Sequence, residues 1–366
     1  MASHGVPADR VPGRRILVIN PGSTSTKVAV YEDDRPLFTG QVEHSAAELA
    51  ALGSVAAQEP LRRRAVLDLL AGARLDLAGM AAVVGRGGLL KPVGAGVYRV
   101  NPAMLADLRR AERGEHAANL GGLIAAEIAA GLGVPALVVD PVSVDEFEPV
   151  ARLSGLPEIE RRSLLHALNI RAGARRAAAE LGKPLSELNL IVAHLGGGIS
   201  VCPLAGGRMV DVNNANEEGP FSPERAGGLP AASLARLCFS GRYDQDELLR
   251  RLNSRGGMVA YLGTNDLKEA LGRARSGDHQ AGLVIEAMAY QIAKEIGAMA
   301  TVLRGRVDAV VIAGGLARSA EFTDLIRARV AFIAPVLVYP GEDEMAALAA
   351  GARRALDGEE SVKDYS

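Results

Sequence analysis

Residues 14–31 have the sequence Arg-Arg-Ile-Leu-Val-Ile-Asn-Pro-Gly-Ser-Thr-Ser-Thr-Lys-Val-Ala-Val-Tyr, two apolar runs separated by a polar turn. The runs 16–19 and 28–31 predict two buried strands, because short apolar runs bounded by turn residues are typical of strands. The glycine of the turn permits a tight reversal with inward N–H groups, and the hydroxyl residues and Lys27 add further donors. An ordinary hairpin turn needs only Asn-Gly or Asp-Gly. The turn therefore predicts a phosphate-binding site.

The composition limits the class of protein. A chain of 366 residues suits two domains, and 48% hydrophobic with 23% charged residues is ordinary for a globular enzyme. A net charge of -2 and 4% aromatic residues argue against nucleic-acid and acidic-membrane partners. No apolar run approaches the ~18 residues needed to span a membrane, and only two cysteines occur. We therefore expect a cytoplasmic protein, with residues 1–13 a loose tail rather than a signal peptide.

The opening pattern occurs twice. The run Leu190-Ile-Val-Ala-His194-Leu-Gly196 lies 174 residues after Ile16-Leu-Val-Ile-Asn20-Pro-Gly22, and Gly197, Gly198 and a second apolar run follow it. A third strand is predicted in each half, at 36–42 and at 208–212. Two such halves, each continued by alternating helices and strands, predict α/β sheets with helices on both faces. Two glycine-rich turns that face each other predict a clamp that binds a nucleotide. The alternative interpretation of the repeat is a duplicated structural domain without catalysis.

The remaining elements follow from periodicity. The longest predicted helix is 278–304, where apolar residues recur every three or four positions. The weakest point between the halves is the Pro- and Gly-bearing run 141–157. The other predicted strands are 81–84, 136–140, 308–313 and 335–339, and the other predicted helices are 103–112, 120–131 and 344–355.

Several motifs resemble one family. The segments 20–27, 194–198 and 313–315 are similar to motifs of the acetate and butyrate kinases, within the actin, sugar-kinase and Hsp70 superfamily. Strings at 114–121, 139–146 and 213–228 resemble the butyrate kinases in particular. The resemblance implies an α/β fold of two duplicated ribonuclease-H-like (actin-like ATPase) domains with a nucleotide and substrate cleft between them. The expected parts are a tail at 1–13, an acyl-substrate domain at 14–150 plus 341–366 with a returning C-terminal helix, and a nucleotide-binding domain at 151–340.

The resemblance also implies an activity. Family members phosphorylate a short-chain carboxylate with ATP and Mg²⁺, giving an acyl phosphate and ADP reversibly, by in-line transfer without an obligatory phosphoenzyme and as homodimers. The chemistry is consistent, because a carboxylate is already ionised at pH 7 and needs no general base. The reaction needs instead the alignment of two anions and neutralisation of the migrating phosphoryl charge.

Four catalytic residues are implied by the resemblance. Arg86 would hold the substrate carboxylate bidentately, and Arg225 would stabilise the transition state. His166 would donate to the transferring phosphoryl group, and Asp140, after an apolar strand, would position Mg²⁺ or the arginine. The alternatives are a solvated surface Arg86, a helix-start His166 satisfied by a neighbouring carbonyl, and a helix-capping Asp140.

Other residues are implied as ligand contacts. Gly197 departs from the acetate kinases, which have Asn there, so only backbone donors remain. Glu344 is the expected metal ligand together with Asn20, although Glu342 and Asp343 are neighbours and acids that open a helix also suit its dipole. The phosphate-binding set is Asn20, Ser23, Ser25, Lys27, His194, Gly196, Gly197 and Gly198, and the nucleotide-binding set is Asp266, Leu267, Lys268, Gly314 and Gly315.

Substrate length is inferred from one position. Gly88 stands where acetate kinases have a valine, and a missing side chain there would enlarge the acyl pocket near His116, which has a core or hinge role as its alternative. Butyrate or isobutyrate is therefore favoured over acetate or propionate. The rival classes are a sugar kinase that uses Asp140 as a base and a non-catalytic ATP-binding module. The sequence leaves open the physiological acid, the favoured direction and the oligomeric state.

Overall fold

The computed structural model describes residues 13–366, and the predicted loose tail lies outside the described residues except for Gly13. Contacts divide the chain into two units. The first unit holds residues up to Lys91 together with Gly96–Pro141 and Glu344–Ser366, and the second holds Pro92–Ala95 and Val142–Asp343. The functional roles predicted for 14–150 with 341–366 and for 151–340 remain predictions.

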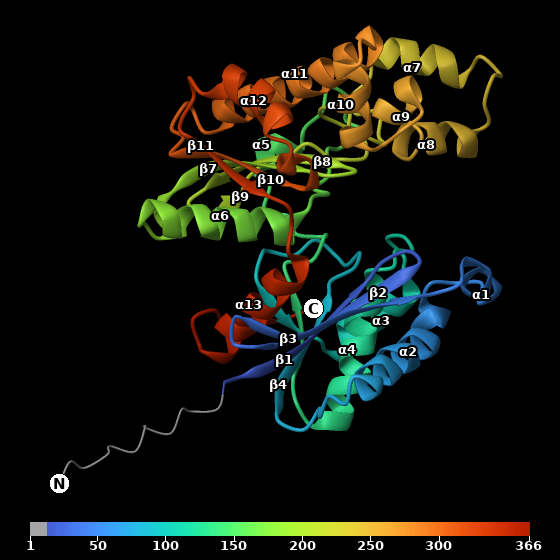
Figure 1. The fold of residues 1–366 in the computed structure, drawn as a ribbon, viewed down its shortest axis with the longest axis vertical. Helices are drawn as coiled ribbons and strands as arrows, with labels where there is room; N and C mark the ends of the chain where they lie inside the picture. Colours follow the sequence, from blue (N-terminus) through green and yellow to red (C-terminus); the bar gives the residue numbers. More distant parts are fainter. Residues whose placement is uncertain (1–12) are drawn as a thin grey trace. The chain divides into compact units, whose positions relative to one another are not determined.

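The first unit is built on one sheet (Figure 1). Its seven strands lie in the order β12-β5-β6-β4-β1-β2-β3. The strands are β1 (Arg15–Pro21), β2 (Ser25–Glu32), β3 (Arg35–Glu43), β4 (Met80–Arg86), β5 (Val97–Arg99), β6 (Ala136–Val139) and β12 (Val362–Asp364). The helices are α1 (Ala46–Ala51), α2 (Glu59–Gly72), α3 (Pro102–Arg110), α4 (Asn119–Leu132) and α13 (Glu344–Leu356).

The two faces of this sheet are covered by different helices. A Cβ on Gly85 would meet the backbone of Gly121 in α4, whereas a Cβ on Gly351 in α13 would meet Val139. Arg86 is paired in register with Val139, so Gly85 and Val139 point to opposite faces because strand side chains alternate. Helix α4 therefore packs on one face and α13 on the other, and Arg86 points to the face of α13.

The second unit repeats this plan. Its five strands lie in the order β11-β10-β7-β8-β9, which matches β6-β4-β1-β2-β3 of the first unit. The strands are β7 (Asn189–Leu195), β8 (Ile199–Ala205), β9 (Arg208–Met209), β10 (Ala309–Gly314) and β11 (Val336–Pro340). The helices are α5 (Pro149–Arg152), α6 (Ala167–Leu181), α7 (Ala231–Cys238), α8 (Gln245–Asn253), α9 (Gly257–Leu262), α10 (Leu267–Arg275), α11 (His279–Val302) and α12 (Ala320–Val330).

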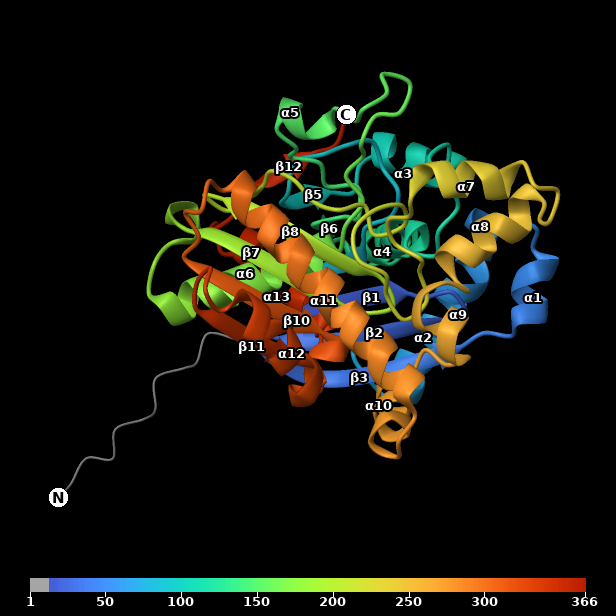
Figure 2. The same cartoon turned by 90° about the horizontal axis from the view of Figure 1, so that it is seen from above.

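Helices cover both faces of the second sheet as well. Figure 2 shows α11 lying across the sheet, and α6 packs beneath β7 and β10. The alternation along β7 sorts its residues, since Ile191 and Ala193 join the core under α11, whereas Leu190 and Val192 join the core against α6. His194 continues the second set and so points to the face of α6. The predicted α/β class and the two repeated halves are confirmed.

One predicted strand is wrong in its length. The strand predicted at 208–212 ends at Met209, because the amide side chain of Asn213 takes the ladder positions of a third strand. Asn213 Oδ1 accepts from Val201 N at 2.6 Å, and Asn213 Nδ2 donates to Ile199 O at 2.9 Å. At Ile199 and Val201 the edge of β8 is therefore satisfied by a side chain instead of a backbone.

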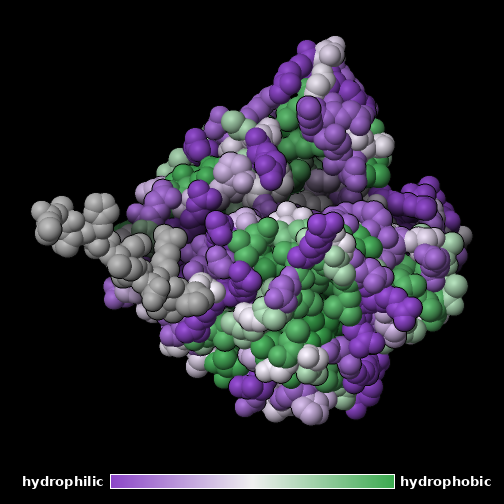
Figure 3. Space-filling view, turned by 60° about the horizontal axis from the view of Figure 1, so that its bottom comes forward, coloured by the Kyte–Doolittle hydropathy of each residue, from purple (hydrophilic) through white to green (hydrophobic). Residues whose placement is uncertain are grey.

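The surface carries both hydrophobic and hydrophilic residues. Figure 3 shows one face of the molecule, where hydrophobic residues form several areas that hydrophilic residues separate. Among residues 13–366, no helix is both long enough and apolar enough to span a membrane.

Candidate active site

Three predicted residues of the first unit form one cluster. Asn20, near the end of β1, donates from Nδ2 to Glu344 Oε2 at 2.7 Å, and Arg86, at the end of β4, forms an ion pair with Glu344 Oε1. The side chain of Arg86 is only 10% exposed, and its Nε is buried without a hydrogen-bond partner in the described part of the chain. Arg86 is therefore not a solvated surface arginine. The cluster holds one anion between two donors at the start of α13.

The structure distinguishes Glu344 from its neighbour Glu342. Glu344 belongs to the first unit, whereas Glu342 belongs to the second and accepts from Asn169 Nδ2 at 3.2 Å. Glu342 Oε2 also lies 3.3 Å from His194 Nε2. Glu344 and Glu342 therefore contact different residues, Glu344 in the first unit and Glu342 in the second.

Asp140 is not a helix cap. It directly follows β6, and the next helix, α5, begins only at Pro149, so the capping alternative is wrong. Its Oδ1 accepts from Gly96 N at 2.7 Å, and its own N donates to Gly96 O at 2.9 Å. The residue is 3% exposed and has a φ of 39°, a left-handed conformation that is uncommon for a side-chain-bearing residue. Such strained backbone is concentrated at functional sites.

Gly88 faces a neighbour and not an open space. A Cβ at this position would lie 2.2 Å from Asn119 Oδ1 and 2.5 Å from Asn119 Cα. Asn119 is buried at the start of α4, and its Oδ1 accepts from Leu89 N at 2.8 Å. The glycine thus makes room for Asn119. The substrate-binding roles of Gly88 and of His116, exposed before α4, remain predictions.

The opening turn connects β1 to β2 at one end of the sheet. Gly22 N donates to Ser25 O at 2.7 Å and closes the turn, leaving Ser23 exposed at its tip. Lys27 is exposed on β2 and lies opposite Asn20 in the register, so both side chains occupy one face.

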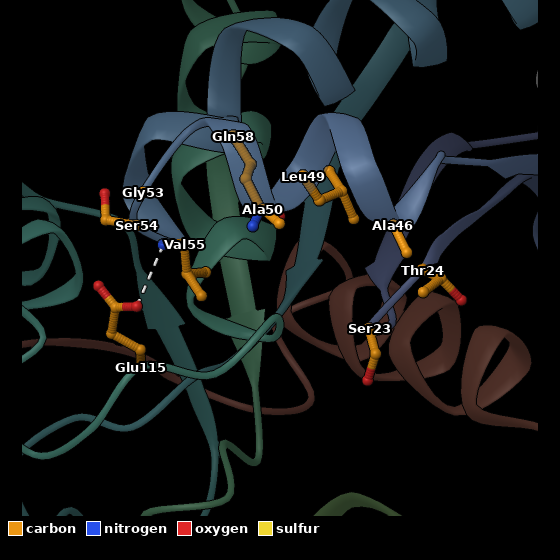
Figure 4. A pocket seen from close by; sticks show the side chains of 10 residues that line it. All are labelled: Ser23, Thr24, Ala46, Leu49, Ala50, Gly53, Ser54, Val55, Gln58 and Glu115. Carbon is orange, nitrogen blue, oxygen red and sulfur yellow. Dashed lines mark hydrogen bonds between the residues drawn. The ribbon is translucent and has the colours of Figure 1, made fainter.

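A pocket of about 330 Å³ lies beside this turn (Figure 4). Ser23 and Thr24 form one wall, and Glu115 accepts from Val55 N at 3.3 Å on the other side. The pocket is lined by Ser23, Thr24, Ala46, Leu49, Ala50, Gly53, Ser54, Val55, Gln58 and Glu115.

Sequence reasoning missed Arg62, which binds the inner side of the turn. It lies in α2 and is fully buried, and it donates to the backbone oxygens of Gly22 and Ser23 at 2.8 and 2.7 Å. A signal for it exists in the sequence, because Arg62 shares a helical stripe with the buried Val66 and Leu70. An arginine within a buried apolar stripe of a helix indicates that its guanidinium has specific hydrogen-bond partners.

The predicted histidines of the second unit lie together. His166 stands at the start of α6, and its ring centroid is 4.3 Å from that of His194. His166 Nδ1 is hydrogen-bonded to the Ser200 hydroxyl at 3.0 Å. Both histidines therefore lie at the carboxyl end of β7.

Arg225 contacts the second glycine-rich turn. A Cβ on Gly198 would lie 2.4 Å from Arg225 Nη1, which donates to Ala215 O at 3.2 Å. Within the turn Gly196 N donates to Gly198 O at 3.1 Å, and a Cβ on Gly197 would be 3.3 Å from a Glu224 carboxylate oxygen. Burial lowers the pKa of Arg225. The structure thus brings a partly desolvated cation to the predicted phosphate loop.

The five residues predicted to bind the nucleotide have different surroundings. Asp266 caps α10 by accepting from Lys268 N at 2.8 Å, and Lys268 is exposed. Leu267 is buried in the core against α11, so its side chain packs inward. A Cβ on Gly314, whose φ is 101°, would be 2.4 Å from Leu195 O, whereas the space at Gly315 is open. The nucleotide-binding role of this set remains a prediction.

Comparison with known proteins assigns the family. The Acetokinase family profile matches residues 161–337. The chain is 49% identical to butyrate kinase 1 of Clostridium acetobutylicum and 51% identical to probable butyrate kinase 2 of Caldanaerobacter subterraneus subsp. tengcongensis, in each case over 96% of this chain and 99% of the relative. Acetate kinase of Porphyromonas gingivalis has a similar fold, with a TM-score of 0.79 at 20% identity, covering 94% of this chain and 100% of that structure. The two repeated α/β units have the actin-like ATPase fold. The chain belongs to the acetokinase family, and the resemblance inferred from its motifs is confirmed.

Proposed function

We propose that this protein transfers the γ-phosphoryl group of ATP to butyrate, giving butyryl phosphate and ADP, and that it also runs in reverse. The observation that supports it most is the identity of about half of all residues with butyrate kinases over nearly the whole chain. Isobutyrate is a second candidate acceptor.

Arg86 is the proposed carboxylate ligand. Its guanidinium is nearly buried, and Nε is a donor without a partner in the described residues. A substrate carboxylate could accept from this donor and from a second N–H in the bidentate arrangement that arginine favours. Because butyrate is ionised at neutral pH, binding in this way aligns the nucleophilic oxygen without a general base.

The second unit supplies the proposed phosphoryl contacts. His166, His194 and Arg225 are donors at or beside the turn 196–198, and hydrogen bonds from such groups stabilise charge that develops during transfer. We assign the acyl substrate to the first unit and the nucleotide to the second, with Gly315 open to a ligand. Asp140 would act by positioning, through its bonds to Gly96.

Mg²⁺ is the proposed cofactor together with ATP. Mg²⁺ prefers oxygen ligands and usually combines one or two carboxylates with substrate phosphates and water. Glu344 offers such a carboxylate and Asn20 an amide oxygen, so this donor set fits the ion, which would neutralise phosphate charge. Among residues 13–366 no group of three or more His, Cys, Asp or Glu is arranged to hold a metal. The remaining ligands would come from the nucleotide and water.

The acceptor can be tested by trapping the acyl phosphate as a hydroxamate. The purified protein is incubated with ATP, Mg²⁺ and acetate, propionate, butyrate or isobutyrate in parallel, with a hexose as a further acceptor. We expect the highest kcat/KM with butyrate. A clear preference for acetate would contradict the assigned chain length and keep the kinase assignment, whereas phosphorylation of the hexose alone would contradict both.

We also propose a cytoplasmic homodimer. Val150, Leu153, Leu156 and Ile159 are between 58% and 79% exposed within ten residues of the second unit, and such apolar surface favours association. Both cysteines are free, and Cys238 is exposed, which suits a reducing compartment. A net charge of -2 supports neither a nucleic-acid nor an acidic-membrane partner. Sedimentation of the purified protein tests the dimer.

A further inference from the structure

Arg62 is a fully buried cation beneath the opening turn. It lies in α2, on the side of the sheet opposite to Asn20 and Lys27, because its partner Thr26 alternates with Lys27 along β2. Its guanidinium makes five hydrogen bonds: Nη1 to Gly22 O, Ser25 O and Thr26 Oγ1 at 2.8, 3.0 and 3.3 Å, Nη2 to Ser23 O at 2.7 Å, and Nε to Gln58 Oε1 at 3.1 Å.

These bonds fix the direction of the amides on the turn. In a trans peptide the C=O and the following N–H point in opposite directions. Because the carbonyls of Gly22 and Ser23 point at Arg62, the N–H groups of Ser23 and Thr24 point away from it. No hydrogen bond to a described residue is found for either of these amides. Two successive outward N–H groups form a concavity for an anion.

Arg62 also replaces an ordinary turn bond. In a hairpin turn the carbonyl of the first residue usually accepts from the amide three positions later. Here Gly22 O accepts from Arg62 Nη1 instead. A side chain of α2 thereby sets the shape of the loop between β1 and β2.

The charge of Arg62 is not neutralised locally. All five acceptors are uncharged oxygens, and among residues 13–366 no carboxylate forms an ion pair with it. Burial lowers the pKa of Arg62, and burial together with the Arg62 cation lowers the pKa of His44, which is hydrogen-bonded to Thr26 Oγ1 at 2.9 Å. A buried cation without a counter-ion favours an anion on the opposite side of the turn.

We propose that Arg62 is a positioning residue for phosphoryl transfer: it holds the turn 22–26 with the Ser23 and Thr24 amides directed at the phosphate and adds positive potential there. This role rests on the proposed function of the turn. Arg62 has no exposed surface and does not itself touch the substrate.

Kinetics of Arg62→Lys and Arg62→Gln test this role. We expect kcat to fall about 100-fold in either variant, as expected when a reacting group is misplaced by about 1 Å. KM for butyrate should change little, because the carboxylate is assigned to Arg86. Added guanidinium at sub-denaturing concentration should restore part of the kcat of Arg62→Ala and leave the wild type unaffected.

The matched control is Val66→Ala, one turn further along the buried stripe of α2. It removes core packing without touching the turn, so it should lower the unfolding temperature and leave kcat unchanged below that temperature. If Arg62→Lys matches Val66→Ala in both measurements, Arg62 is only structural and the inference fails. Should no Arg62 variant fold, Gln58→Leu removes the Nε acceptor and should lower kcat by a smaller factor.

A second readout does not depend on the kinase reaction. Hydrogen exchange of the Gly22 amide, which donates to Ser25 O at 2.7 Å, should accelerate at least tenfold in Arg62→Lys and remain unchanged in Val66→Ala. Unchanged exchange in Arg62→Lys overturns the inference. If the wild type phosphorylates no acid but the exchange result holds, the positioning of the turn stands and the proposed function fails.

Discussion

Replacement of Gly88 by alanine tests why a glycine stands two residues after Arg86. The added Cβ would lie 2.5 Å from Asn119 Cα and 2.7 Å from Asn119 N, which are backbone atoms that cannot rotate away. Ordinary carbon contacts need about 3.5 Å, so residue 88 or the start of α4 must shift by about 1 Å. Overpacking of this kind costs about 1–3 kcal/mol.

The shift also affects a hydrogen bond. Asn119 Oδ1, 2.2 Å from the added carbon, now accepts from Leu89 N, and the loss of such a bond costs about 0.5–1.5 kcal/mol. We therefore expect Gly88→Ala to lower the free energy of unfolding by about 1.5–4.5 kcal/mol. Urea denaturation followed by circular dichroism measures this change.

The control is Gly131→Ala in α4, the helix that begins at Asn119. A Cβ there would have no neighbour within 4 Å, and the residue is exposed near the end of α4. Removing a helical glycine should stabilise the protein by about 0.5–1 kcal/mol.

The acyl profile of Gly88→Ala separates the two explanations of the glycine. Crowding predicts that activity with acetate and butyrate falls together. A variant as stable as the wild type whose kcat/KM ratio moves toward acetate would refute the crowding argument and support an acyl pocket at Gly88.

Three further outcomes are expected. Arg86→Ala should lower kcat/KM for butyrate at least about 1,000-fold in the hydroxamate assay, because it removes the cation assigned to the substrate carboxylate; near-normal turnover would exclude that role. Burial and Arg62 lower the pKa of His44 from 6.5, so below pH 6.5 the unfolded chain binds more protons than the folded chain. The free energy of unfolding therefore falls as the pH drops below 6.5, by up to about 1.4 kcal/mol per pH unit. His44→Gln should flatten this part of the urea-midpoint profile, and an unchanged slope would contradict the assignment. Tyr365→Phe should lower the free energy of unfolding by about 1–3 kcal/mol, because it removes the hydroxyl that donates to the buried Asp107 Oδ2 at 2.7 Å; thermal unfolding equal to the wild type would count against this bond.

Much of the site could be predicted because its residues follow buried strands. Asn20 and Arg86 stand at the carboxyl ends of β1 and β4, which are parallel neighbours in one sheet, so these ends lie close together. His194 stands at the carboxyl end of β7 in the second sheet. The repeat of 174 residues predicted two equivalent turns, and β1 and β7 do begin 174 residues apart, at Arg15 and Asn189. Glu344 was one of three adjacent acids, and only the structure brings it to Arg86 and Asn20.

By itself, the amino-acid sequence determined the strands, the duplication and the family, because apolar periodicity and contiguous motifs are local properties of the chain. The tertiary structure alone decided what supports those motifs. Arg62 beneath the turn, Asn213 in place of a third strand and Asn119 against Gly88 are all contacts between a side chain and a backbone distant in sequence. Such contacts have no local period, since they depend on how segments distant in sequence pack against one another.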